Sequence, residues 1–324
     1  MNKSDRKTIS GNGGKANRPA PAASGEAPDV GRLPPWIRVR VHAGQNRGEV
    51  SGLIDDLELN TVCRSAKCPN LAECWHRRTA TFMILGDRCT RNCGFCAIKA
   101  FSPLPVERDE PERVAEAAAR LGLKFVVVTS VNRDDLPDKG SEHFVATVTA
   151  LKRRIPGVGV EVLTPDFKGR HELIERVMCA RPLVFNHNME TCERLSRPVR
   201  SGGRYERSLS VLAMAKEMAG RQTAVKSGMM VGLGETDEEV EATMADILDA
   251  GVDILTIGQY LPPTREHWPL QRYVEPGRFD YWSELAERMG FKAVASAPLV
   301  RSSYRAEEMA RRALETDPQI AVDG

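Results

Sequence analysis

Short apolar runs alternate with stretches of helical periodicity between residues 81 and 258. Each run is short enough to form a buried strand, and polar or glycine residues follow it. The predicted strands are 81–86, 125–130, 158–164, 183–188, 224–232 and 252–258. Two of the stretches between them are typical amphipathic helices. One, 111–121, begins with proline, and the other, 236–250, begins with Thr236 and Glu239 at capping-box spacing and stops before Gly251.

This alternation of strands and helices predicts an α/β fold built on a parallel sheet. Right-handed crossovers would curl six such units into part of a barrel, so we expect an incomplete, TIM-like (β/α)6 barrel. In barrels of this kind the chemistry lies at the carboxyl ends of the strands. Polar or glycine-containing segments follow all six predicted strands, at 89–96, 129–135, 164–167, 186–188, 232–235 and 258–263. We therefore expect a single site at this rim.

The same pattern divides the chain into four parts. Residues 1–34 are rich in Gly, Pro, Ala, Ser and Lys without apolar periodicity, which predicts a disordered tail. A mitochondrial presequence is the alternative, but acidic residues and many Gly and Pro residues would spoil its amphipathic helix. Residues 35–80 form a cysteine-containing N-terminal extension, 81–290 the partial barrel, and 291–324 a C-terminal extension.

Composition narrows the classes of partner. The 324 residues include 46 basic and 44 acidic side chains, for a formal net charge of +2. So small a net charge gives no strong field for polyanions, and nucleic acid is not an expected partner. No run approaches the ~18 apolar residues that a membrane span needs, and no apolar core of a secretory signal follows the N-terminus. We expect a cytoplasmic protein, with the mitochondrial matrix as the less favoured location, and reduced thiols.

Six of the eight cysteines fall into two groups of three, with the spacings CxxxxCxxxxxC and CxxxCxxC. The groups are Cys63, Cys68 and Cys74, and then Cys89, Cys93 and Cys96. Disulfides are disfavoured in a reducing compartment, and structural zinc usually takes four ligands from paired CxxC-type knuckles. Closely spaced thiolates instead favour two iron–sulfur clusters, each lacking one cysteine ligand. The other two cysteines, Cys179 and Cys192, are expected to be small buried apolar residues.

The CxxxCxxC group lies directly after a predicted strand and has Phe95 before its last cysteine. In this setting it resembles the cluster-binding loop of radical S-adenosylmethionine (SAM) enzymes. The resemblance implies that Cys89, Cys93 and Cys96 are catalytic and hold a [4Fe-4S] cluster. Its open iron would bind SAM, whose reductive cleavage gives a 5′-deoxyadenosyl radical.

Further segments resemble the lipoyl synthase family, over about residues 50–310. They are 63–74, 129–137, 185–190, 226–235, 255–263 and 298–304, and the last contains the motif Arg-Ser-Ser-Tyr at 301–304. The resemblance implies that a serine of this motif completes an auxiliary [4Fe-4S] cluster held by Cys63, Cys68 and Cys74. Register favours Ser303, with Ser302 as the alternative.

The resemblance also implies the reaction: a sulfurtransferase that inserts two sulfur atoms, at C6 and C8 of an octanoyl group on a lysine of a lipoyl carrier protein. The auxiliary cluster would be the sacrificial sulfur source. The carriers would be the lipoyl domains of 2-oxoacid dehydrogenase E2 components and the glycine-cleavage H protein. Reduced flavodoxin or ferredoxin would donate electrons. The alternative is a biotin-synthase-like enzyme that inserts sulfur into a free small molecule, but the upstream triad disfavours it.

SAM contacts are expected from two strand ends. By resemblance, Thr129, Ser130 and Asn132 would bind the polar groups of SAM. Asn186, His187 and Glu190 should face the same volume, and His187 is either a hydrogen-bonded residue of the rim or a direct contact. Arg301 either pairs with a carboxylate near the auxiliary cluster or orients the serine loop.

Overall fold

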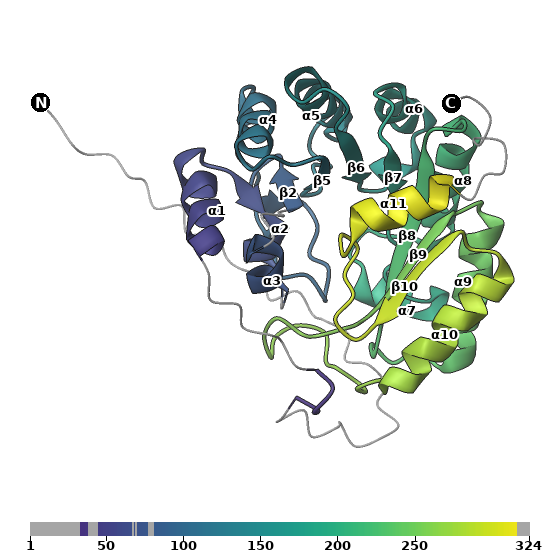
Figure 1. Ribbon diagram of the computed structural model, residues 1–324. Helices are drawn as coiled ribbons and strands as arrows, with labels where there is room; N and C mark the ends of the chain where they lie inside the picture. The colour runs from purple at the N-terminus through teal and green to yellow at the C-terminus, as the bar shows by residue number, and fades with distance from the viewer. Residues whose placement is uncertain (1–32, 38–44, 67, 69, 77–80, 316–324) are drawn as a thin grey trace, which may run out of the picture.

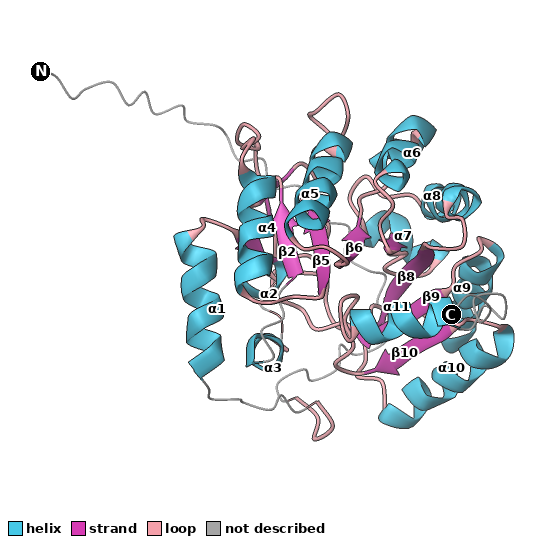
Figure 2. Cartoon of the chain, turned by 45° about the horizontal axis from the view of Figure 1, so that its top comes forward, coloured by secondary structure: helices cyan, strands magenta, loops and turns pink. Residues whose placement is uncertain are grey.

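A computed structural model describes residues 33–37, 45–66, 68, 70–76 and 81–315 (Figure 1). The predicted disordered tail therefore lies almost entirely outside the described residues, and so does the presequence alternative. Eight strands of the described chain form one sheet, in the order β1-β2-β5-β6-β7-β8-β9-β10. The helices that connect the strands lie around the outside of this sheet (Figure 2).

All but one of the strands in this sheet run parallel. The exception is β1, which pairs antiparallel with β2 at one edge. The strands are β1 (Asn60–Thr61), β2 (Thr81–Ile84), β5 (Phe125–Ser130), β6 (Gly159–Leu163), β7 (Val184–Asn186), β8 (Ala224–Val231), β9 (Ile254–Gln259) and β10 (Ala293–Ala297). A separate two-stranded ladder, β3 (Arg88–Cys89) with β4 (Lys99–Ala100), closes the base of the second cysteine loop.

Most of the helices connect one parallel strand to the next. They are α4 (Glu110–Arg120), α5 (Ser141–Arg154), α6 (His171–Cys179), α7 (Glu193–Val199), α8 (Tyr205–Met218), α9 (Asp237–Asp249) and α10 (Pro276–Met289), with a short 3-10 turn η1 (Phe167–Gly169). The N-terminal part contributes α1 (Gln45–Asp56), α2 (Val62–Ser65) and α3 (Leu71–His76), and the described chain ends with α11 (Ala306–Glu315).

The sequence predicted the repeating unit correctly but not the number of strands. All six predicted strands are present, and β5 has the predicted bounds. The seventh parallel strand, β10, was not predicted, because Val294 is the only β-branched residue in its sequence Ala-Val-Ala-Ser-Ala. The sheet is α/β, mostly parallel and open, since β1 and β10 lie at opposite edges and do not pair.

The predicted helix signals act as expected. In α9 the Glu239 N–H donates to the Thr236 hydroxyl at 3.2 Å, and the Thr236 N–H donates to the Glu239 carboxylate at 2.9 Å. Gly251, with φ +82°, takes the left-handed conformation that ends this helix. Both predicted amphipathic helices are therefore confirmed to within one residue at each end.

The last helix closes the amino-terminal end of the partial barrel. Its apolar face, Met309, Ala310 and Ala313, packs on the first residues of four strands, Val184, Ala224, Ile254 and Ala293. Figure 1 shows α11 lying across these strands. The carboxyl ends of the strands remain available for a site.

A fully buried ion pair lies in the interior of the barrel. Lys226 Nζ lies 2.9 and 3.0 Å from the two carboxylate oxygens of Glu161, and Asn186 Nδ2 donates to the same carboxylate at 2.8 Å. Side chains alternate along a strand, so residues two positions apart face the same side. Leu163, two residues after Glu161, and Asn188, two residues after Asn186, therefore face the same interior nearer the carboxyl ends. Of the described residues, no helix is long and apolar enough to cross a membrane.

Candidate functional site

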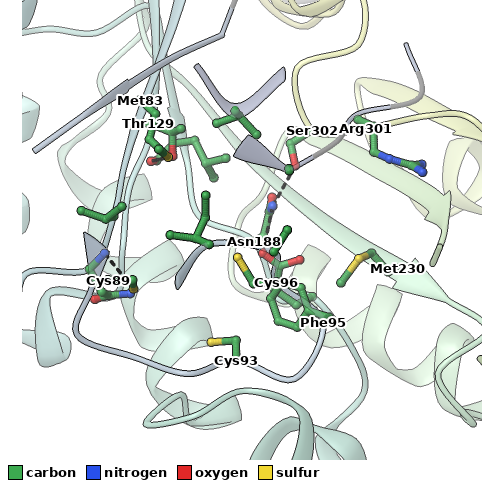
Figure 3. A pocket seen from close by; sticks show the side chains of 18 of the residues that line it. Met83, Cys89, Cys93, Phe95, Cys96, Thr129, Asn188, Met230, Arg301 and Ser302 are labelled. Carbon is green, nitrogen blue, oxygen red and sulfur yellow. Dashed lines mark hydrogen bonds between the residues drawn. The ribbon is translucent and has the colours of Figure 1, made fainter. Parts of the chain in front are cut away.

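A cavity of about 510 Å³ opens at the carboxyl ends of the strands (Figure 3). Its wall contains five of the six patterned cysteines: Cys63, Cys68, Cys89, Cys93 and Cys96. Residues of the loops after β2, β5, β6, β7 and β9 complete the wall, together with 301–303. Five of the six segments expected at this rim therefore line one cavity, and 232–235 does not.

Hydrogen bonds between protein groups hold the second cysteine loop, 89–96. The Asn132 N–H donates to Cys89 Sγ at 3.3 Å, and the Cys96 N–H donates to the Cys93 carbonyl at 3.1 Å. Gly94 N–H donates to the Val199 carbonyl at 2.8 Å. Burial raises the pKa of the Cys93 thiol to about 11 and that of Cys96 to about 12. At neutral pH these thiols therefore stay protonated unless a bound cation compensates the charge of the thiolate.

The first triad approaches the same cavity from the N-terminal extension. Cys63 lies in α2, and the Cys68 N–H donates to the Cys63 carbonyl at 3.1 Å. Asn70 Nδ2 donates to the Leu299 carbonyl at 2.7 Å, which ties this segment to a loop 229 residues away. Cys74 lies in α3, is partly exposed, and does not line the cavity.

The donor set fits clusters better than a single ion. No three His, Cys, Asp or Glu side chains among the described residues stand close enough to share one metal ion. A multi-iron cluster has a different requirement, because each thiolate binds a different iron and the thiols must stand apart. Cys89, Cys93 and Cys96 are free thiols around one cavity, and three such thiolates are typical ligands of an iron–sulfur cluster.

The two serines of the late motif have different surroundings. Asn188 Nδ2 donates to the Ser302 hydroxyl at 2.7 Å, and Figure 3 shows this contact. Ser303 also lines the cavity, but its hydroxyl has no hydrogen-bond partner among the described residues. Arg301 donates to the Val300 carbonyl at 2.6 Å and pairs with no carboxylate in the described part of the chain. Of its two predicted roles, the geometry favours orienting the serine loop.

The predicted SAM residues after β5 all line the cavity, with unequal freedom to bind a ligand. Thr129 already donates its hydroxyl hydrogen to the Leu163 carbonyl at 2.8 Å. The Asn132 carbonyl accepts from the N–H and the hydroxyl of Thr90, both at 3.0 Å. The buried Ser130 hydroxyl and the side-chain amide of Asn132 have no hydrogen-bond partner among the described residues, so these two groups remain available.

Residues after β7 divide between the interior and the cavity. The expectation that Asn186 faces the cavity was wrong: its amide donates to the Glu161 carboxylate of the buried ion pair, and it does not line the cavity. His187 lines it but is 3% exposed and is hydrogen-bonded through both nitrogens, to the Thr164 carbonyl at 2.9 Å and the Ser208 hydroxyl at 3.0 Å. Burial lowers its pKa to about 4, so the ring is neutral. Of its two predicted roles, the hydrogen-bonded rim residue agrees with the structure.

Sequence reasoning missed a buried cation in the cavity wall. Arg200 is 7% exposed and donates to the Met189 carbonyl and the Ser208 hydroxyl, both at 3.0 Å. From the sequence, the arginine-rich segment 194–207 is typical of a solvated charged face, with a docking surface for an acidic carrier domain as the alternative. Arg194 does lie on an exposed face, where it pairs with Glu239 at 2.7 Å, whereas Arg207 pairs with the buried Asp166 at 2.8 Å. Local charge density carries no signal of which arginines turn inward.

Arg91, inside the second cysteine loop, was missed as well. Its guanidinium contacts Asp134 and Asp166, which follow two neighbouring strands, and both Arg91 and Asp166 line the cavity. The available signal was the place of each residue, within a cysteine loop or directly after a strand. One expectation outside the site was wrong: Cys179 is exposed, although Cys192 is buried as predicted.

Comparison with known proteins places the chain among radical SAM proteins. A family model described as the Radical SAM superfamily matches residues 83–247. The lipoyl synthase of Rubrobacter xylanophilus is 52% identical over 275 residues, which cover 85% of each chain. That of Caldicellulosiruptor saccharolyticus is 52% identical over 86% of this chain and 97% of its own. That of Nitratidesulfovibrio vulgaris is 50% identical, over 89% and 96% respectively.

Solved structures support the fold alone. The [FeFe]-hydrogenase maturase from Carboxydothermus hydrogenoformans superposes with a TM-score of 0.55 at 14% identity, covering 82% of this chain and 70% of that one. Methylornithine synthase superposes with a TM-score of 0.51 at 14% identity, covering 78% and 82%. The architecture is therefore shared with enzymes of quite different sequence.

Proposed function

The chain belongs to the lipoyl synthase family of radical SAM enzymes, and we propose that the residues around its cavity hold two clusters and SAM for this activity. The enzyme inserts two sulfur atoms, at C6 and C8 of an octanoyl group on a lysine of a lipoyl carrier protein. Its cofactors are two [4Fe-4S] clusters and SAM. The likeness to lipoyl synthases over most of the chain decides against the biotin-synthase-like alternative.

One observation carries the residue assignment. Two cysteines of the first group, all three of the second and residues 301–303, which are far apart in the sequence, meet at one cavity of about 510 Å³. The bond from Asn70 to the Leu299 carbonyl fixes the first group beside the serine loop. We propose that Cys63, Cys68 and Cys74 hold the auxiliary cluster. We propose that Cys89, Cys93 and Cys96 hold the radical-generating cluster.

Ser303 is the proposed fourth ligand of the auxiliary cluster. The Ser302 hydroxyl is occupied by Asn188, whereas the Ser303 hydroxyl lines the cavity without a partner in the described chain. An oxygen ligand is hard beside three soft thiolates, so its bond to iron should be the weakest of the four. A weak bond suits a cluster that gives up its sulfur.

C6 and C8 carry no acidic hydrogen that a side-chain base could remove. The reaction therefore needs a carbon radical and a source of sulfur, which the cofactors supply when bound. The chain's own residues orient the substrate and exclude water. Met83, Leu163 and Met230 give the cavity apolar surface for a hydrocarbon chain. Holding the reacting carbons in place converts a diffusive encounter into an oriented one.

The SAM contacts follow from the polar groups that remain available. We propose Thr129, Ser130 and Asn132 on one side of the cavity, with Ser130 contributing its unpaired hydroxyl. Arg200 is a buried cation in the same wall, and no carboxylate forms an ion pair with it among the described residues. Its charge suits the carboxylate group of SAM.

The partners and the division of the chain are proposals of the same kind. The carriers would be E2 lipoyl domains and the glycine-cleavage H protein, and reduced flavodoxin or ferredoxin would deliver electrons. Strands β2 and β5 to β9 would make up a six-unit radical SAM barrel at 81–290. The N-terminal extension 35–80 and the C-terminal extension 291–324 would flank it, and β10 belongs to the latter.

An anaerobic assay tests this proposal. Reconstituted protein should hold about eight irons per chain, four for each cubane. With reductant, SAM and an octanoylated lysine peptide, the peptide should gain the mass of two sulfur atoms. Full iron content with an unchanged peptide would contradict the proposed function, and zinc in place of iron would contradict the cluster assignment.

A further inference from the structure

Arg91 lies between the first two cysteines of the loop 89–96, and all three nitrogens of its guanidinium donate hydrogen bonds. Nε and NH2 donate to the two carboxylate oxygens of Asp134 at 2.8 and 3.0 Å. NH1 and NH2 donate to the two carboxylate oxygens of Asp166 at 3.0 and 2.7 Å. One side chain of the cysteine loop thus joins the segments that follow β5 and β6.

These contacts belong to a chain of alternating charges. Lys168 lies 2.9 Å from Asp134, and Arg207 lies 2.8 Å from Asp166, at the two ends of the chain. The side chains of Arg91 and Asp166 are 6% and 0% exposed. Water therefore screens the central pair little, and each buried charge depends on its partner.

The backbone beside Arg91 is also bound to the segment that follows β5. Thr90 donates from its N–H and its hydroxyl to the Asn132 carbonyl, and the Asp134 N–H donates back to the Thr90 hydroxyl at 3.1 Å. The turn at Gly202, with φ +71°, lies over the Arg91 stem, so that a Cβ there would lie 3.5 Å from Arg91 Cδ. The first half of the loop is therefore enclosed from two sides.

The second half of the loop has separate anchors. Gly94 is held by the Val199 carbonyl and by the Trp268 N–H, both at 2.8 Å, and Phe95 packs on the apolar cluster that contains Trp268. None of these contacts involves Arg91 or its carboxylates. A disturbance of Arg91 should therefore affect the first half of the loop more than the second.

From this geometry we infer that Arg91 is a positioning residue for the radical-generating cluster. Through Asp134 and Asp166 it holds residues 89–93 against the ends of β5 and β6, and so fixes the direction in which Cys89 and Cys93 present their sulfur atoms. The inference rests on the proposed role of the second cysteine triad. Lysine cannot replace arginine here, because a point charge cannot bind two carboxylates through a planar fork.

The test uses the full-length chain, both before reconstitution and with both clusters. Arg91→Lys keeps the charge but removes the fork. Asp134→Asn weakens one side of the contact and, because Asp134 is partly exposed, disturbs folding less. Asp135→Asn is the matched control: Asp135 is the next residue, and it pairs with Arg133 instead of Arg91.

Two measurements distinguish positioning from a general loss of stability. Hydrogen exchange at the Thr90 amide should speed up at least tenfold in Arg91→Lys and Asp134→Asn, while the Gly94 amide stays within twofold of wild type. In the reduced holoenzyme, SAM changes the electron paramagnetic resonance signal of the cluster that binds it. The SAM concentration giving half of that change should rise at least tenfold in both variants and stay within twofold in Asp135→Asn.

The outcomes separate the two proposals. If Thr90 exchange stays within twofold of wild type in Asp134→Asn, or if Asp135→Asn raises it equally, Arg91 does not position the loop. If Arg91→Lys does not fold, Asp134→Asn still decides. If the wild-type spectrum does not respond to SAM, the proposed function fails, whereas the exchange experiment continues to test the contact.

Discussion

The side-chain amide of Asn188 donates a 2.7 Å hydrogen bond to the hydroxyl of Ser302 and so joins the segment after β7 to a loop 114 residues further along the chain. The same amide group lies 3.2 Å from the Glu190 carboxylate. One asparagine therefore contacts both the strand end proposed to face SAM and the loop proposed to complete the auxiliary cluster. This contact separates the roles of two adjacent serines.

Replacing each serine by alanine should give different results. Ser303→Ala removes the proposed fourth ligand, so sulfur insertion should fall at least a hundredfold while reductive cleavage of SAM continues. Ser302→Ala loses one hydrogen bond, worth about 1 kcal/mol, and should lower sulfur insertion less than tenfold. Product mass and 5′-deoxyadenosine, measured on the same samples, check this. The reverse order of the two variants would transfer the ligand role to Ser302.

Cys93→Ala should abolish SAM cleavage and leave the auxiliary cluster in place. Iron content should fall from about eight to about four per chain, because one cubane is lost. Cys179→Ala is the control, since this cysteine is exposed and does not line the cavity. Cleavage that survives in Cys93→Ala would mean that the two triads have been assigned the wrong way round.

His187 should make the protein sensitive to mild acid. A carbonyl only accepts, so Nδ1 donates to Thr164 and Nε2 accepts from Ser208, which fixes the neutral ring. Burial lowers the pKa of His187 from 6.5 to about 4. Between pH 4 and pH 6.5, His187 binds a proton in the unfolded chain but not in the folded chain. Stability is therefore lost as the pH falls from 6.5 to 4, by on the order of 3 kcal/mol.

His187→Gln should lack this loss of stability. Denaturant unfolding of both proteins, measured at intervals across the same pH window, gives the difference in the free energy of unfolding. His171→Gln is the control, because His171 is exposed at the start of α6. A wild-type curve parallel to that of His187→Gln would rule out this source of acid sensitivity.

The buried ion pair should respond differently to single and double substitution. Lys226→Met leaves the Glu161 carboxylate without its cation in the barrel interior and should destabilise the protein by about 3–5 kcal/mol. Adding Glu161→Leu removes the stranded charge and should restore much of that loss. Thermal unfolding of the two variants checks the sign. If the double variant is less stable than Lys226→Met, the unpaired Glu161 carboxylate is not the cause of the loss of stability.

The sequence alone determined the repeating unit of the fold and the identity of the chemistry. Apolar runs and helix signals are local, so β5 and the α9 capping box could be predicted without any knowledge of contacts. The cysteine patterns are local too, because successive ligands lie only a few residues apart. Resemblance added the ligand role of the Arg-Ser-Ser-Tyr motif, which spacing could not supply.

Only the tertiary structure decided which polar side chains reach the site. Asn186 and Asn188 lie two residues apart, yet one is bound to Glu161 in the interior and the other to Ser302 at the cavity. Arg91 meets carboxylates 43 and 75 residues away, and Asn70 meets a carbonyl 229 residues away. Such pairings depend on strand order, on the face that each side chain takes and on the path of the connecting loops. Local periodicity encodes none of these over such separations, so they become visible only when the strands have assembled.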